Sequence, residues 1–207
     1  MSLPKLPKST VRVPLGMRHS WYFPIKEEPE NAHPKYDAKL DMGHAVKGYL
    51  SVTPVTFELP GDDDIQVDIE KFGSGQLDVE TTMSDLEVNA KLYGHKFTEE
   101  DGEVSSDQDA ACLGGYAFVE PVMLKDQTLV FRASAFFKVQ PIMGSEKQEA
   151  DTKKGGEISP KMNAVSMKVR RDKSGAWRQR KEFATIKEAD AWIDSIFPNA
   201  AAAAETH

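Results

Sequence analysis

Catalytic and metal sites are built from residue types that this sequence has in small number or in the wrong arrangement. A single cysteine, Cys112, among 207 residues excludes an internal disulfide framework and a cysteine-rich zinc site. The five histidines do not follow a ligand spacing such as His-x-x-x-His. No Gly-x-Ser-x-Gly motif is present, and Gly73-Ser74-Gly75 does not match a phosphate-binding loop. We therefore expect no enzyme activity, no bound metal and no cofactor.

Three local patterns have both a chemical and a structural interpretation, and the structural one is favoured each time. Asp62-Asp63-Asp64 lacks the alternating oxygen ligands and the distal glutamate of a calcium loop, which favours an acidic turn. The sequence supplies no base for Cys112, which favours a small packing residue. Trp177 within the basic stretch 168–181 could stack on a nucleic-acid base, but a solvated hairpin is favoured.

Long apolar runs are also missing. No run reaches the roughly 18 apolar residues of a membrane span, and the first residues lack the apolar core of a secretory signal. We therefore expect no membrane partner and synthesis in the cytoplasm. The net charge of −7 argues against a dedicated nucleic-acid binder.

The charge is unevenly spread along the chain. Between Glu58 and Asp109 there are 16 acidic and three basic residues, and between Lys161 and Lys187 there are nine basic and two acidic ones. One interpretation is a pair of solvated faces of opposite sign. The other is a pair of complementary surfaces that meet when copies of the chain assemble.

Strand signals dominate after Gly48. Ile65–Glu70 and Gln76–Glu80 alternate apolar and polar residues, which predicts two strands with one buried face and one wet, acidic face, separated by a turn at 73–75. The further expected strands are 116–124 and 129–140, joined as a hairpin, and 162–171 and 177–183, flanking a hairpin turn at 172–175. The expected loops are 98–109 and 144–156.

Capping signals predict two short helices. The first spans 85–93, with Ser84 or Thr82 as its N-cap and Gly94 ending it. The second spans 187–197 and is capped by Thr185. Together the elements predict an α+β, mainly β fold: an antiparallel β-sandwich or partial barrel with one or two short flanking helices.

We expect three parts along the chain: an extended, proline-rich N-terminal arm at 1–45, the sandwich domain at 46–198 and a disordered tail at 199–207. The prolines of the arm remove backbone donors and disfavour regular strands. The segment Trp21–Ile25 is nevertheless too apolar for a free tail. It should pack against the body of the chain or against a neighbouring subunit.

Several segments, taken in order, carry a resemblance to a known family. They are Gly75–Thr81, Asp85-Leu86, Leu92–Lys96, the acidic loop ending in Asp109, the strands around Phe118 and Phe131, Asp151–Lys153, and Gly175–Arg178 leading to Ala191–Ile193. Their order and spacing resemble the major tail proteins of long-tailed, non-contractile bacteriophages, the phi13-type family. The resemblance covers Gly48 to Phe197, and it is carried by the order of the segments, since each alone is a turn or capping pattern.

The resemblance implies a subunit of the tail tube in the virion. Such subunits share a β-sandwich with a flanking helix and form hexameric rings stacked into a hollow cylinder. The implied partners are further copies of the chain, the tape measure protein and the tail terminator and tip proteins. Viral DNA would pass through the lumen without tight binding, since an acidic lumen repels phosphates.

Candidate residues for these roles follow from the strand and arm patterns. The lumen-facing candidates are Asp68, Glu70, Asp78 and Glu80. The candidates for contacts between subunits or between rings are Trp21, Phe23, Asp62, Asp63, Asp64, Lys153 and Lys154.

Three alternatives stay open on the sequence alone. A related tube in a phage-derived particle without DNA, such as a bacteriocin, would have the same sequence features. A monomeric β-sandwich module that binds glycan or nucleic acid would show a localised aromatic or basic patch, for which Trp177 and its neighbouring arginines are the only support. An enzyme is the least favoured, because no nucleophile, base and ligand constellation is present.

Overall fold

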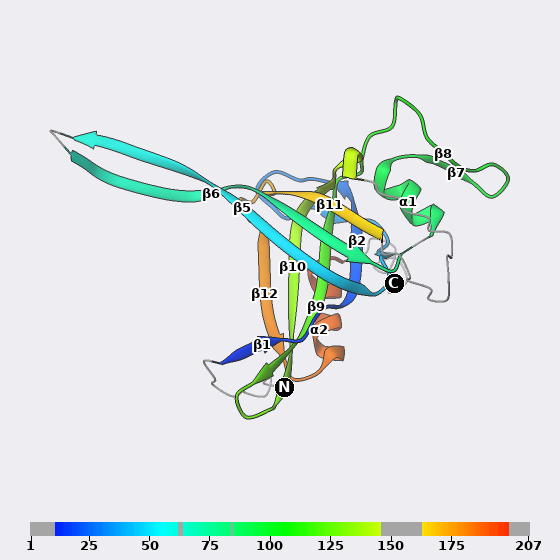
Figure 1. Ribbon diagram of the computed structural model, residues 1–207. Helices are drawn as coiled ribbons and strands as arrows, with labels where there is room; N and C mark the ends of the chain where they lie inside the picture. The colour runs from blue at the N-terminus through cyan, green and yellow to red at the C-terminus, as the bar shows by residue number, and fades with distance from the viewer. Residues whose placement is uncertain (1–10, 62–63, 84, 146–162, 199–207) are drawn as a thin grey trace, which may run out of the picture.

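The alternating apolar residues build one antiparallel sheet of ten strands, flanked by two helices (Figure 1). The computed structural model describes residues 11–61, 64–83, 85–145 and 163–198. The strands are β1 (Arg12–Pro14), β2 (Arg18–Glu27), β3 (Lys35–Tyr36), β4 (Leu40–Asp41), β5 (Ala45–Gly61), β6 (Asp64–Thr81), β7 (Lys96–Thr98), β8 (Gly102–Val104), β9 (Gly114–Leu124), β10 (Leu129–Pro141), β11 (Asn163–Arg170) and β12 (Arg178–Phe183). The helices are α1 (Leu86–Tyr93) and α2 (Ile186–Ile196), with a short 3-10 turn at Met143–Ser145. The mainly β, antiparallel α+β fold is thus confirmed, and the sheet does not close into a barrel.

The β9–β10 hairpin is the centre of the sheet, whose main path runs β3-β2-β9-β10-β11-β6-β5. β10 pairs on one edge with β9, and on the other edge with two strands in succession. Residues 131–136 pair with β12, whereas residues 138–141 pair with β11. The β9–β10 register shifts between Phe136 and Val139, where such a bulge bends a strand. This bend lets the chain of β11, β6 and β5 form a second layer over the first.

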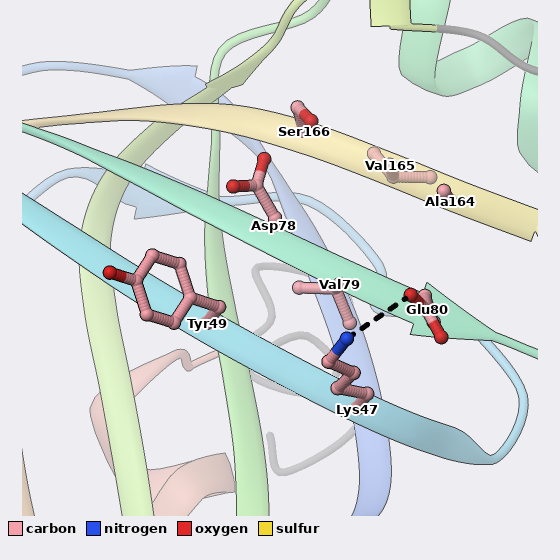
Figure 2. Close-up of a pocket in the computed structure, with 8 residues that line it drawn as sticks. All are labelled: Lys47, Tyr49, Asp78, Val79, Glu80, Ala164, Val165 and Ser166. Carbon is pink, nitrogen blue, oxygen red and sulfur yellow. Dashed lines mark ion pairs between the residues drawn. The ribbon is translucent and has the colours of Figure 1, made fainter.

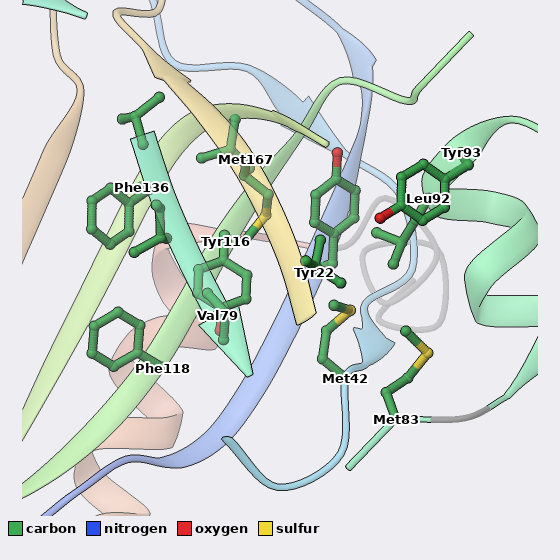
Figure 3. Packing of buried hydrophobic residues seen from close by; sticks show 14 residues of the cluster. Tyr22, Met42, Val79, Met83, Leu92, Tyr93, Tyr116, Phe118, Phe136 and Met167 are labelled. Carbon is green, nitrogen blue, oxygen red and sulfur yellow. The ribbon is translucent and has the colours of Figure 1, made fainter. Parts of the chain in front are cut away.

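The main core lies between these two layers (Figure 3). Tyr116, Phe118 and Phe136 extend from the first layer. They meet apolar residues of β6 and β11 in the second layer, which are Leu77, Val79, Val165, Met167 and Val169. Leu92 and Tyr93 of α1 close one end of this core.

A second core lies on the opposite face of β9 and β10, where α2 packs. The sheet presents small residues here, with Ala117 paired to Ala135. They let Ala189 and Ile193 of α2 approach the sheet, and all four side chains are fully buried. Thr185 and Glu188 form a capping box at the start of α2, which confirms the predicted cap.

The N-terminal segment is not an arm where the structure describes it, and the domain boundary at residue 45 is wrong. β2 pairs with β9 inside the main sheet, and Tyr22 and Phe23 are buried. The prolines do not prevent this: Pro24 lies within β2 opposite Gly114, and Pro14 ends β1 opposite Val122. Residues 1–10 and 199–207, and thus the predicted disordered tail, lie outside the described residues.

Two further expectations about local structure are wrong. Gly73-Ser74-Gly75 is not a turn, since β6 runs without interruption from Asp64 to Thr81. β11 and β12 are not paired with each other, although Asp172 does hold the turn between them by accepting bonds from the backbone of Ser174 and Ala176. The second error could not be found from alternation, because alternation identifies a strand but not the strand with which it pairs.

The helix ends and the loop need smaller corrections. The N-cap of α1 is Asp85, whose carboxylate accepts from the backbone of Glu87 and Val88. Gly94 ends this helix in the left-handed conformation, as predicted. The loop predicted at 98–109 contains the last residue of β7 and all of β8, which pair as a small two-stranded sheet. The β9–β10 hairpin is confirmed.

Replacing Ile193 with alanine is expected to lower the free energy of unfolding by about 2–5 kcal/mol, because it leaves a cavity between α2 and the sheet. Denaturant unfolding followed by circular dichroism measures this. Lys187→Ala, an exposed change in the same helix, should stay within about 0.5 kcal/mol of the parent. Equal losses in both variants would contradict the packing of α2 described above.

Candidate functional site

A polar surface with a regular structure lies on the outward side of the second layer (Figure 2). Three cross-strand rungs build it from β5, β6 and β11. Each rung aligns one residue from each strand, and paired residues share a face of the sheet. The rungs are Lys47–Glu80–Ala164, Tyr49–Asp78–Ser166 and Ser51–Gln76–Lys168. We call this surface, with the adjoining Thr53, Ser74 and Arg170, the outer face.

The outer face is open and hollowed rather than enclosed. Two adjoining hollows of about 310 and 670 Å³ follow the rungs. Residues of the opposite parity, such as Leu77, Val79 and Met167, point inward and are buried in the main core. Successive side chains of β6 therefore point alternately into the core and to a solvent-exposed surface, as its sequence predicted.

The outer face is not acidic, contrary to the expectation from β6 alone. Asp78 and Glu80 do lie on it, where Gln76 donates to Asp78 at 2.9 Å and Lys47 lies 3.8 Å from Glu80. β11 pairs directly alongside and adds Lys168 and Arg170. Three basic residues thus accompany two acidic ones, which gives a net charge of one positive unit. The basic residues of β11 were visible in the sequence, within the basic stretch 161–187, but the sequence did not show that this stretch pairs with β6.

The four acidic candidates do not share one face. Ser74 pairs with Thr53, but Phe72 pairs with Pro54, so Gly73 is an extra residue in β6. A bulge of this kind reverses the alternation that follows it. Glu70, which is exposed, therefore falls on the side of the hairpin opposite to Asp78 and Glu80. The backbone of Asp68 pairs with Glu58 farther along the same hairpin.

Only glycine fits the bulge position. A Cβ added to Gly73 would lie 2.7 Å from Cγ2 of Val55 and 2.8 Å from the carbonyl oxygen of Thr53. Both distances are shorter than real contacts of this kind. The glycine that resembles a turn signal is thus required by close contact between the two strands.

Beyond the bulge, the β5–β6 hairpin projects from the body (Figure 1). The last pairing of β11 with β6 is Val169 with Gly75, and no other described strand pairs with the hairpin farther out. Val55 and Phe57 are 59% and 60% exposed, and Ile69, which pairs with Phe57, is 40% exposed. The backbone of Asp64 pairs with Gly61 near the tip. We call 53–61 and 64–74 the projecting hairpin.

The other assembly candidates are divided between the core and undescribed segments. Phe23 is 1% exposed and stacks on Phe197 at 4.2 Å, so it belongs to the second core and is unavailable for a contact between subunits. Trp21 is half-buried against the same core, with the ammonium of Lys39 5.0 Å from its ring. Asp62, Asp63, Lys153 and Lys154 lie outside the described residues.

A cluster of arginines, which the sequence did not place, lies on the first layer. Arg178 and Arg180 of β12 share a face with Arg132 of β10 and Glu120 of β9, as their pairing shows. Arg12 and Arg132 both contact Glu182. We call these six residues the arginine face; they are Arg12, Glu120, Arg132, Arg178, Arg180 and Glu182. Burial raises the pKa of Glu120 against the opposing effect of the arginines.

Two histidines have carboxylate and hydroxyl neighbours, but neither forms a catalytic relay. Nδ1 of His33 lies 2.6 Å from Asp172 and 3.4 Å from Oγ of Ser174. Nδ1 of His95 likewise faces both Glu103 and Ser105, while its Nε2 lies 3.9 Å from Asp109, which is longer than a hydrogen bond. A relay needs the hydroxyl and the carboxylate on different ring nitrogens. These contacts instead tie loops to the body of the fold.

The remaining chemistry of the described residues is sparse. Burial raises the pKa of the Cys112 thiol, which disfavours the nucleophilic thiolate. Among residues 11–61, 64–83, 85–145 and 163–198, no group of three or more His, Cys, Asp or Glu side chains could hold a metal ion. In the same part of the chain, no helix combines the length and apolar character needed to cross a membrane.

No protein-family model matches the chain, and no curated protein matches its sequence.

Replacing Gly73 with alanine is expected to lower the free energy of unfolding by about 1–3 kcal/mol, because the added methyl group forces the two strands of the hairpin apart. Thermal unfolding measures the loss, and hydrogen exchange should show faster exchange at residues 53–57. Gly144→Ala is the matched control, since a Cβ there meets nothing within 4 Å. A Gly73→Ala variant as stable as the control would contradict the tight bulge.

Proposed function

We infer that the chain is a structural subunit of a bacteriophage tail tube, which assembles into stacked hexameric rings whose lumen conducts DNA. Its partners in this function are further copies of itself, the tape measure protein and the tail terminator and tip proteins, and its location is the tail of the virion. The observation that carries the proposal is a long unpaired sheet edge beside a wet, hollowed face. The resemblance of the segments between Gly48 and Phe197 agrees with it.

The unpaired edge belongs to β5. β5 spans Ala45 to Gly61 and ends the order of the described sheet, so only its β6 side is paired. Proteins that act alone shorten, cover or charge such an edge, because it offers a row of free backbone groups to another chain. β5 carries Lys47, Pro54 and Pro60, which protect an edge locally. Its exposed side chains also include Tyr49, Val52 and Val55, which are typical strand residues and leave the stretches between open to pairing. A strand from a neighbouring copy would satisfy the edge.

The outer face suits the lumen of such a tube. Ring closure of the β5–β6–β11 layer from several copies would place all outer faces inside or all outside, because one face of the layer is already occupied by the main core. Serine, threonine and glutamine separate the charges, and no continuous basic stripe runs along the strands. Tight binding of DNA needs many neutralised phosphates, so this mixture lets a duplex pass without being held.

The binding-module alternative finds less support. Trp177, its main candidate, already stacks on Phe72 at 4.3 Å, and the guanidinium of Arg178 lies 4.4 Å from its ring. These contacts occupy the ring surface that a base or sugar would need. The enzyme alternative has no described constellation of nucleophile and base to support it.

Purified protein at high concentration is expected to form stacked rings with a central hole in negative-stain electron microscopy. Mass photometry of the diluted sample should show multiples of the 23.0 kDa chain. Particles that bind glycan or duplex DNA tightly while staying monomeric would contradict the tube and favour the binding module.

The double variant Asp78→Lys with Glu80→Lys is expected to bind a short duplex at least about tenfold more tightly at low salt, because five basic residues then line the outer face without an acidic one. Fluorescence anisotropy over a salt series measures this, and added salt should weaken the gain. Glu99→Lys with Glu100→Lys makes the same charge change at exposed residues of the β7–β8 turn. Equal gains in both variants would mean that total charge, and not the outer face, sets the affinity.

A further inference from the structure

The projecting hairpin and the arginine face carry opposite charge and are both incompletely covered. The projecting hairpin holds four acidic residues, Glu58, Asp64, Asp68 and Glu70, and one basic residue, Lys71. The arginine face holds four arginines against two glutamates, a net charge of two positive units. Interfaces between proteins arrange complementary potentials in this way.

The positive charge of the arginine face is not neutralised within the described fold. Glu182 is shared between Arg12 and Arg132, which leaves Glu120 as the neighbouring acid of the other two arginines. Arg180 is exposed, and burial, together with the nearby charge of Arg180, lowers the pKa of Arg178. A carboxylate brought to this point would relieve the repulsion between the two guanidinium groups.

The edge of β12 beside these arginines is open as well. Among the described strands, β12 pairs only with β10. An extended segment can therefore add to β12 by backbone hydrogen bonds while its side chains reach Arg178 and Arg180. The hairpin supplies such a segment, with strands that are already formed and extended.

The hairpin cannot reach the arginine face of its own chain. Phe72, at the base of the projecting hairpin, stacks on Trp177 immediately before β12. From this point the hairpin runs away from the body (Figure 1). Its nine outward residues in β5, 53–61, extend roughly 30 Å at the rise of a strand. A contact between the two surfaces would therefore join two copies of the chain.

We propose that the projecting hairpin of one copy lies along β12 of a second copy, with its acidic residues against Arg178 and Arg180. The inference rests on the proposed function, because it names the contact by which neighbouring subunits would be joined. Each copy supplies one hairpin and one arginine face, so the contact is head-to-tail and can continue from copy to copy. Phe57 and Ile69 are exposed on the opposite face of the hairpin, so the acidic residues and not this apolar pair would meet the two arginines.

Charge-reversed variants test the contact in the full-length chain. Arg178→Glu with Arg180→Glu changes the acceptor, and Asp68→Arg with Glu70→Arg changes the hairpin. Each variant alone is expected to raise the concentration needed for assembly at least about tenfold, because like charges then meet. A one-to-one mixture should return to within about threefold of the parent, since one contact is then native and the other has its charges exchanged.

A matched control changes the charge of β12 without changing the arginine face. Lys181 lies in β12 on the opposite face, and Lys187 is exposed in α2. Lys181→Glu with Lys187→Glu makes the same charge change as the acceptor variant but should leave assembly unchanged. Near-ultraviolet circular dichroism and the thermal midpoint show that each variant is folded.

Cross-linking separates this inference from the proposed function. A photoreactive phenylalanine analogue at position 57, in a mixture of isotope-labelled and unlabelled chains, should join to the peptide holding Trp177–Phe183 of another copy. Rings or tubes whose cross-links and charge variants leave β12 unaffected would overturn the inference and leave the tube intact. Assemblies joined through β12 but without a central hole would support the inference and count against the tube. Loss of duplex DNA binding in the acceptor variant, with assembly unchanged, would overturn it in favour of a nucleic-acid surface.

Discussion

The bend in β10 is the constraint on which the rest of the structure depends. Before the bend, β10 pairs with β12 and presents small residues to α2; after it, β10 pairs with β11 and starts the second layer. Without this change of partner, β11, β6 and β5 would extend the first layer and the aromatic residues of β9 and β10 would remain uncovered. Both cores, and the outward direction of the outer face, follow from the bend.

A second irregularity decides how charge is distributed on the hairpin. The extra residue at Gly73 reverses the alternation of β6, which separates Glu70 from Asp78 and Glu80. The same bulge brings Phe72 onto Trp177, and so fixes where the hairpin leaves the body. Gly73 therefore decides which acidic residues of β6 lie on the outer face and which on the opposite side, and where the projecting hairpin begins.

The histidine contacts have a structural role that complements this framework. His33 stacks on Phe137 at 4.2 Å and bonds to Asp172, whose side chain is fully buried and also holds the turn before β12. His95 joins the end of α1 to Glu103 of β8. Each histidine thus ties a loop or turn to the body of the fold, which gives these carboxylate–imidazole pairs a structural role.

The sequence by itself determined what local forces control. The alternation of β6, the hairpin of β9 and β10, the Gly94 end of α1 and the Thr185 cap of α2 all depend on residues within a few positions of one another, and all were predicted. Only the tertiary structure decided which strands became neighbours: β2 entered the sheet, Phe23 entered the core and basic β11 joined acidic β6. Pairing of distant strands depends on the total burial achieved by the whole chain, which local alternation does not encode. For this reason the acidic strand could be recognised in the sequence, whereas the mixed charge of the outer face and the arginine face could not.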